Sequence, residues 1–148
     1  MKKIIAISLV AVAAGFSTTA ISAGEFGSAA EAKAMLEKAV SAVKANKAAA
    51  LGQFAKGEGG FRDRDLYPFC GGPDGNFSAH PTLNGKSMKD LMSKANEPIG
   101  AKLYEAAKEG SIAEVPYMWP RPGTTEPVQK LSYVTKIGDQ VCAVGYYK

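Results

Sequence analysis

Polar aromatic and basic side chains gather in the second half of the sequence, in a pattern typical of a small-anion site. Tyr117 and Trp119 alternate along one apolar segment, Arg121 follows in a proline-flanked loop, and Lys130 lies in the next apolar segment. Their hydroxyl, indole, guanidinium and ammonium groups are all hydrogen-bond donors. A pocket for a small organic anion combines apolar walls with a few such donors. The alternative, in which the aromatic residues form core and Lys130 is solvated, stays open.

The motifs that carry most enzyme chemistry are missing from the sequence. The chain contains no G-x-S-x-G nucleophile elbow, no P-loop and no G-x-G-x-x-G fingerprint. Its single histidine, His80, is too little for a zinc site. Asp63 and Asp65 do not continue into a calcium-binding pattern, so we interpret them as part of a solvated charged loop. The sequence predicts no enzyme, no metal and no cofactor, and it leaves His80 as a weaker candidate for the anion site.

The N-terminal segment has the order of parts found in a secretory signal peptide. Lys2 and Lys3 precede an uncharged apolar run at residues 4–16, and small residues follow up to Ala23. This run is shorter than the about 20 residues that span a bilayer. We expect cleavage after Ala23, which leaves one domain, residues 24–148, in the periplasm or outside the cell. An uncleaved membrane anchor is the alternative.

Charge and cysteine content fit this location. The 18 basic and 14 acidic residues become 16 and 14 once Lys2 and Lys3 are removed, a net charge of +2. A nearly neutral chain without a basic stripe predicts no nucleic-acid partner. An even number of cysteines in an exported protein favours a disulfide between Cys70 and Cys142 over two buried thiols. A nucleophilic pair of Cys70 with His80 is disfavoured for the same reason.

Helical and extended segments are segregated along the chain, which predicts an α+β fold with an antiparallel sheet. A capping box at Ser28 and Glu31 opens one long predicted helix, residues 28–54. A glycine-rich turn separates the two strands of a predicted hairpin. The other expected elements are a broken helical stretch over residues 87–107 and strands over residues 112–119, 128–137 and 140–147.

Several motifs resemble the single Cache domain of type 2, and they occur in the order found in that family. They are N-F-S-A-H-P at residues 76–81, G-K-S-M at 85–88, V-P-Y-M-W-P-R-P-G at 115–123, P-V-Q-K-L-S-Y-V at 127–134 and V-G-Y-Y at 144–147. The resemblance implies a PAS-like five-stranded antiparallel sheet with a long N-terminal helix packed along it. It also implies extracytoplasmic, sensor-type binding of a small molecule, in this family often a short organic carboxylate.

The resemblance also implies partners. We expect a small organic anion as ligand and a separate membrane-bound signalling or transport protein as partner. A structural or accessory interaction protein that keeps the fold without a ligand is the alternative. The oligomeric state, a monomer or a helix-mediated dimer, stays open.

The expected fold gives the candidate residues a place. In a PAS-like sheet the first and last strands are neighbours, so we expect the Cys70–Cys142 bridge to join them. The pocket is expected between the sheet and residues 81–123. Strand alternation sets Lys130 with Val128, Ser132 and Val134, opposite Leu131, Tyr133 and Ile137. One of these faces should meet the long helix and the other should meet the ligand, with Lys130 as the cation and Arg121 as a second candidate.

Overall fold

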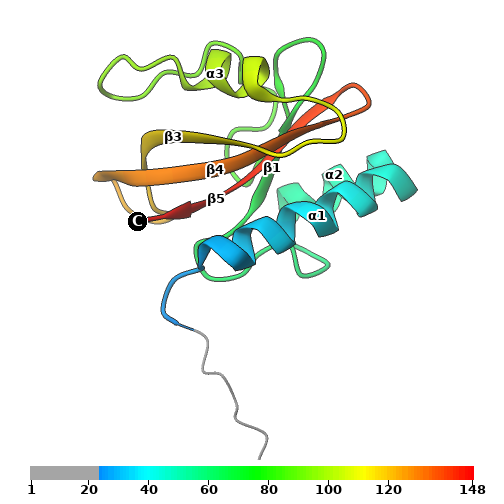
Figure 1. Cartoon of the computed structure of the whole chain (residues 1–148), viewed down its shortest axis with the longest axis horizontal. Helices are drawn as coiled ribbons and strands as arrows, with labels where there is room; N and C mark the ends of the chain where they lie inside the picture. Colours follow the sequence, from blue (N-terminus) through cyan, green and yellow to red (C-terminus); the bar gives the residue numbers. More distant parts are fainter. Residues whose placement is uncertain (1–23) are drawn as a thin grey trace, which may run out of the picture.

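The computed structural model of the chain describes residues 24–148. The predicted signal peptide, residues 1–23, lies outside the described residues. Within the described part, every helix is too short or too polar to cross a membrane. Figure 1 shows three layers, with the N-terminal helices below the sheet and one short helix and long loops above it.

The first helix, α1 (Ala29–Ala45), begins at the predicted capping box. Ser28 accepts a hydrogen bond from the Glu31 backbone N–H, and the Glu31 carboxylate accepts from the Ser28 backbone N–H in return. The buried side chains of this helix recur at helical spacing and pack on the sheet: Ala32, Met35, Leu36, Ala39 and Val43.

The prediction of one continuous helix over residues 28–54 is wrong. Asn46 has an extended backbone, φ −157° and ψ 96°, and its side chain accepts from the Ala49 N–H to open a second helix, α2 (Lys47–Lys56). The ammonium of Lys38, in the middle of α1, donates to the Gly59 carbonyl at 2.7 Å. This contact requires α2 to turn back alongside α1, because a straight helix would carry Gly59 far from Lys38.

The five-stranded antiparallel sheet confirms the predicted α+β, PAS-like fold. Its order is β2-β1-β5-β4-β3, so the last strand lies at the centre, beside the first. The strand bounds are β1 (Pro68–Gly71), β2 (Phe77–Ala79), β3 (Ala113–Pro120), β4 (Pro127–Ile137) and β5 (Gln140–Tyr147).

The predicted disulfide is present between these two central strands. Cys70 and Cys142 are directly opposed in the β1–β5 pairing, and their sulfurs are 2.10 Å apart. Both side chains belong to the core that packs against α1 and α2. The bridge therefore lies on the helical side of the sheet.

The opposite face of the sheet is covered by α3 (Ile99–Ala106) and the loops around it. The helix expected over residues 87–95 is not formed. Ser87 and Asp90 do make the hydrogen bonds of a helix cap. Beyond them, the Ser93 hydroxyl accepts from the N–H groups of Ala95 and Glu97, and these bonds hold a turn in place of a helix.

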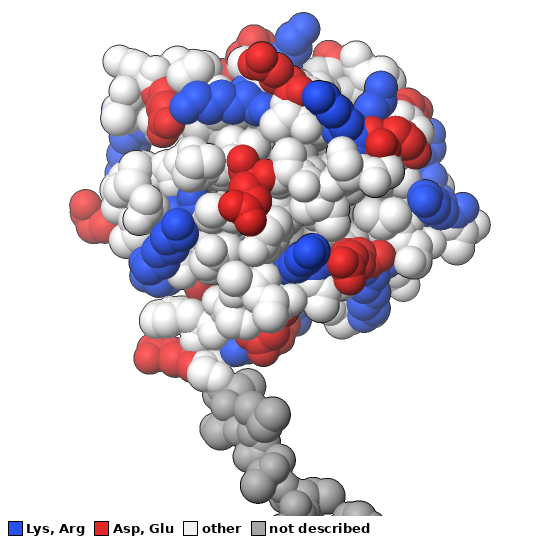
Figure 2. All heavy atoms as spheres, in the orientation of Figure 1, with Lys and Arg blue, Asp and Glu red and all other residues white. Residues whose placement is uncertain are grey.

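Basic and acidic side chains are interspersed on the face of the molecule seen in Figure 2. An exposed pair joins Lys47 to Asp139 at 3.0 Å, and another joins Lys102 to Glu97 at 2.6 Å. Exposed pairs of this kind contribute little to stability. Because charges of both signs are interspersed, the surface in view has no single-sign patch.

Candidate functional site: a lysine chamber behind an open pocket

Two adjacent spaces lie on the loop side of the sheet. The outer one, which we call the outer pocket, has a volume of about 270 Å³ and is lined by the hairpin end, the β3–β4 loop and Arg62. The inner one, the lysine chamber, has about 10 Å³ and is lined by Lys130 and apolar and aromatic side chains. Tyr67, His80 and Trp119 line both spaces. These three side chains therefore form the partition between them.

Lys130 lies at the inner end of this site, on β4. It is 1% exposed, and it is paired across the sheet with Tyr117 of β3 and Tyr147 of β5. The predicted alternation of β4 is confirmed, because Val134 packs in the core on the loop side whereas Tyr133 and Ile137 pack on the helical side. Lys130 thus faces the pocket, as expected from the sequence.

The surroundings of the Lys130 ammonium are aromatic. It donates a hydrogen bond to the Tyr67 hydroxyl at 3.1 Å, and the ring centres of Tyr67, Tyr147 and Phe69 lie 4.6, 5.0 and 5.5 Å away. Among residues 24–148, the ion pairs formed by acidic side chains involve other partners than Lys130. Burial acts against the charged form, but the tyrosines around it outweigh this effect and raise the pKa of Lys130. Within the part of the chain that the structure describes, the site therefore holds a buried cation without a carboxylate partner.

Three neighbours surround the stem of the lysine side chain. The Tyr117 and Ser132 hydroxyls are hydrogen-bonded to each other at 2.8 Å, and both are buried. Gly145 of β5 lies directly against Lys130, since a Cβ at this position would collide with the lysine side chain and with Ser132. A glycine inside a strand often marks such a close approach. The glycine of the V-G-Y-Y motif is therefore part of the site.

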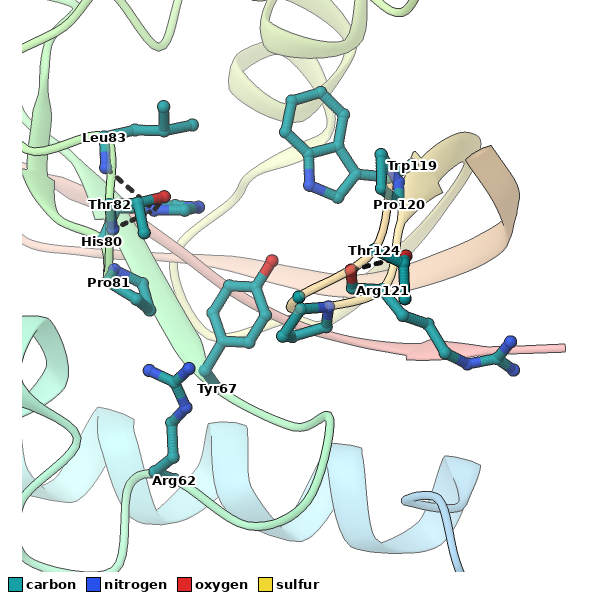
Figure 3. Close-up of a pocket in the computed structure, with 12 residues that line it drawn as sticks. Arg62, Tyr67, His80, Pro81, Thr82, Leu83, Trp119, Pro120, Arg121 and Thr124 are labelled. Carbon is teal, nitrogen blue, oxygen red and sulfur yellow. Dashed lines mark hydrogen bonds between the residues drawn. The ribbon is translucent and has the colours of Figure 1, made fainter. Parts of the chain in front are cut away.

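His80 is held as a neutral ring with a defined tautomer. Its Nδ1 accepts from the backbone N–H groups of Thr82 at 3.0 Å and Leu83 at 3.1 Å, so the proton of the neutral ring is on Nε2. Burial, followed by the charges of Lys130 and Arg62, lowers the pKa of His80 to about 3. Figure 3 shows the ring directed from the hairpin end toward the space in front of Tyr67. His80 can therefore donate a hydrogen bond to an anion.

The low pKa of His80 predicts a pH dependence of stability. A histidine in the unfolded chain titrates near pH 6.5, whereas folded His80 titrates near 3. The contribution of neutral His80 to the free energy of unfolding is therefore complete above pH 6.5 and is lost as the pH falls toward 3. Between pH 6 and pH 4.5, we expect the free energy of unfolding to fall by about 1 kcal/mol per pH unit, measured by denaturant titration.

The control for this experiment is His80→Asn, which keeps an acceptor for the two backbone N–H groups and does not titrate. In this variant we expect the free energy of unfolding to change less steeply with pH, because about one proton fewer is taken up on unfolding. The lowered pKa values of Glu31, Asp63 and Asp139 begin to reduce stability below about pH 5, and they do so equally in the wild type and the variant. An equal slope in both proteins would show that His80 titrates normally.

Trp119 and Arg121 differ in how they lie relative to the pocket. In Figure 3 the indole nitrogen of Trp119 faces the same space as the Tyr67 hydroxyl, while the Arg121 guanidinium points away from it. That guanidinium lies 4.3 Å from the Phe26 ring centre and 3.5 Å from the Asp65 carboxylate. The structure therefore brings together Tyr117, Trp119, Lys130 and His80; Arg121 also lines the outer pocket, but its guanidinium is directed away from them.

Ion pairs and hydrogen bonds hold the loop at residues 61–66, which the sequence analysis interpreted as a solvated charged loop. Arg64 pairs with Glu31 at 2.7 Å and with Asp63 at 2.8 Å, and it donates to two carbonyls of the segment before α1. Asp65 is buried and accepts from the Gly27 N–H at 2.7 Å. Residues 24–148 contain no acidic, histidine or cysteine cluster suited to a metal.

Sequence reasoning missed Tyr67 and Arg62. Tyr67 is buried at the centre of the site, and Arg62 reaches the outer pocket beside it (Figure 3). Strand alternation could have indicated Tyr67. Its side chain lies on the same face of the hairpin strand as Phe69, and Cys70 lies on the opposite face. Arg62 belongs to an irregular loop, where no periodicity indicates the direction of a side chain.

Comparison with known proteins agrees with this fold. Residues 28–147 match the Cache domain family, and the chain belongs to this family. No curated protein matches the chain significantly.

Two solved structures share the fold at low sequence identity. A periplasmic sensor domain of a chemotaxis protein is 22% identical, with a TM-score of 0.60 over 78% of this chain and 86% of that chain. A Cache chemosensory domain, described for its recognition of carboxylic acids, is 21% identical, with a TM-score of 0.55 over 78% of this chain and 84% of that one. At this identity the likeness establishes the fold.

Proposed function

We propose that the protein is a sensor-type binding protein for a short organic carboxylate, not an enzyme. The observation that carries this proposal is Lys130, a buried ammonium at the inner end of a pocket with no acidic partner among the described residues. A buried charge is costly unless it is paired. A ligand carboxylate is the partner that this position lacks.

The residues around Lys130 have the chemistry to hold such a ligand. The Nε2–H of His80 and the indole N–H of Trp119 are neutral donors that face the same space. Phe69, Phe77 and Leu91 form apolar walls, which suit a short aliphatic chain. Arg62, at the outer pocket, attracts anions toward the entrance.

The location and the partner of the protein are part of the proposal. The signal-like N-terminus supports export to the periplasm or beyond the cell. A structural relative is a periplasmic sensor domain of a chemotaxis protein. We propose that this domain likewise works outside the cytoplasm and communicates ligand occupancy to a membrane-bound protein.

One observation favours the alternative, a structural or accessory protein that keeps the fold without a ligand. The lysine chamber holds about 10 Å³, which is no more than one water molecule requires. In that case, the aromatic rings and the Tyr67 hydroxyl would be the permanent partners of Lys130.

Thermal unfolding with a set of small carboxylates separates the two functions. We expect acetate, propionate, pyruvate or lactate to raise the melting temperature, whereas acetamide and propionamide, which have no charge, do not. A ligand at a hundred times its dissociation constant stabilises by about 2.7 kcal/mol, which corresponds to a shift of roughly 5–10 °C here. If no carboxylate shifts the melting temperature at millimolar concentration and matched ionic strength, the alternative is favoured.

A further inference from the structure

The Tyr67 hydroxyl is the hydrogen-bond acceptor of the Lys130 ammonium. The two atoms are 3.1 Å apart, and both side chains are buried, at 5% and 1% exposure. An ammonium at the end of a pocket binds a carboxylate through this kind of contact, donor to oxygen at hydrogen-bond distance. The tyrosine is therefore an internal counterpart of the ligand.

The lysine chamber is too small to hold the Tyr67 hydroxyl and a ligand carboxylate at the same time. With Tyr67 in its present position, the chamber has about 10 Å³, too little for any carboxylate. The outer pocket, on the other side of the same ring, has about 270 Å³. Rotation of the Tyr67 side chain toward the outer pocket would open the chamber and free the ammonium in one movement.

From these contacts, we propose that a carboxylate binds Lys130 by displacing the Tyr67 hydroxyl, so that Tyr67 is a gate and sets the affinity by competition. This inference rests on the proposed function. Because the competing hydrogen bond involves a charged group, its loss on ligand entry weakens binding by a measurable factor. Tyr67 thereby makes the site selective for groups that pair with an ammonium better than a phenol does.

The neighbouring tyrosines show that this role belongs to Tyr67 in particular. The Tyr147 hydroxyl donates to the Pro120 carbonyl at 2.9 Å, and the Tyr117 hydroxyl is bonded to Ser132. Their rings lie 5.0 and 6.0 Å from the ammonium, compared with 4.6 Å for Tyr67. Tyr67 combines the shortest ring distance with the hydroxyl contact to Lys130.

The test is calorimetric titration of Tyr67→Phe with acetate, propionate and pyruvate, next to the wild-type protein. Phenylalanine keeps the ring and removes the competing oxygen. We expect affinity to rise about tenfold for the carboxylate that binds the wild type, since only the ligand-free form loses a charge-assisted hydrogen bond. The control is Tyr104→Phe, which removes a hydroxyl that donates to the Gly72 carbonyl and lines neither the outer pocket nor the lysine chamber, and it should leave affinity within about twofold.

The outcomes distinguish this inference from the function on which it rests. Weaker or unchanged binding by a folded Tyr67→Phe protein, while the wild type binds, would overturn the gate and leave the carboxylate site standing. The gate is supported if Tyr67→Phe binds a carboxylate more tightly than both the wild type and the control variant do. It is also supported if binding is detected in Tyr67→Phe and in neither of the other two proteins. If neither the wild type nor Tyr67→Phe binds any of the three carboxylates, the proposed function fails, and the gate fails with it.

Discussion

Replacing Lys130 with methionine should abolish carboxylate binding, with affinity reduced at least thirtyfold. Truncation of one partner in a buried, hydrogen-bonded charge pair costs about 2–5 kcal/mol. Methionine fills a similar volume and can keep its contacts with the aromatic rings. Calorimetric titration with the carboxylate found in the thermal screen provides the measurement.

Stability should change little in this variant. Methionine removes the burial cost of an ammonium that has no acidic partner among the described residues, but it also removes the interactions with the surrounding tyrosines that offset this cost. Lys136→Met is the matched control, because Lys136 lies on the same strand and is exposed. If Lys130→Met binds the carboxylate as well as Lys136→Met does, Lys130 is not in the site.

The part of the site that could be predicted follows from the period of the strands. In an extended strand alternate residues share a face, so Tyr117 and Trp119 had to lie together, and Lys130 had to face away from Tyr133. Arg121 belongs to the loop that follows, where no such rule applies. Its guanidinium turns to Asp65 and Phe26, two residues that are far away in the sequence.

The local signals of the first helix were correct at its beginning and misleading along its length. Ser28 and Glu31 mark the start of α1, but Asn46 could be read as an ordinary helical residue in an alanine-rich segment. Its side chain can cap a helix, and here the cap is formed because reversal places Phe54 in the core. The tertiary packing that decides between the two conformations is not visible in the local sequence.

The Cys70–Cys142 bridge should be the largest single contribution to stability. It joins positions separated by 72 residues, and closure of a loop of this length stabilises by about 4 kcal/mol on the chain-entropy argument. Guanidinium unfolding of the oxidised and the reduced wild-type protein, with the double variant Cys70→Ala/Cys142→Ala beside them, provides the measurement. We expect the two proteins without the bridge to unfold at much lower denaturant concentration.

Ligand affinity should change far less than stability. The bridge packs with the core beneath α1 and α2, whereas Lys130 and Tyr67 lie on the loop side of the sheet. The bridge also holds β1, which directly follows Tyr67, against the central strand β5, and we expect the backbone pairing of these strands to hold them together in the variant as well. We therefore expect affinity within about threefold of wild type under conditions where the variant is folded, since the bridge and the site lie on opposite faces of the sheet. Unfolding midpoints that coincide with and without the bridge would contradict its role in stability, and a large loss of affinity in the folded variant would show that the two faces of the sheet are coupled.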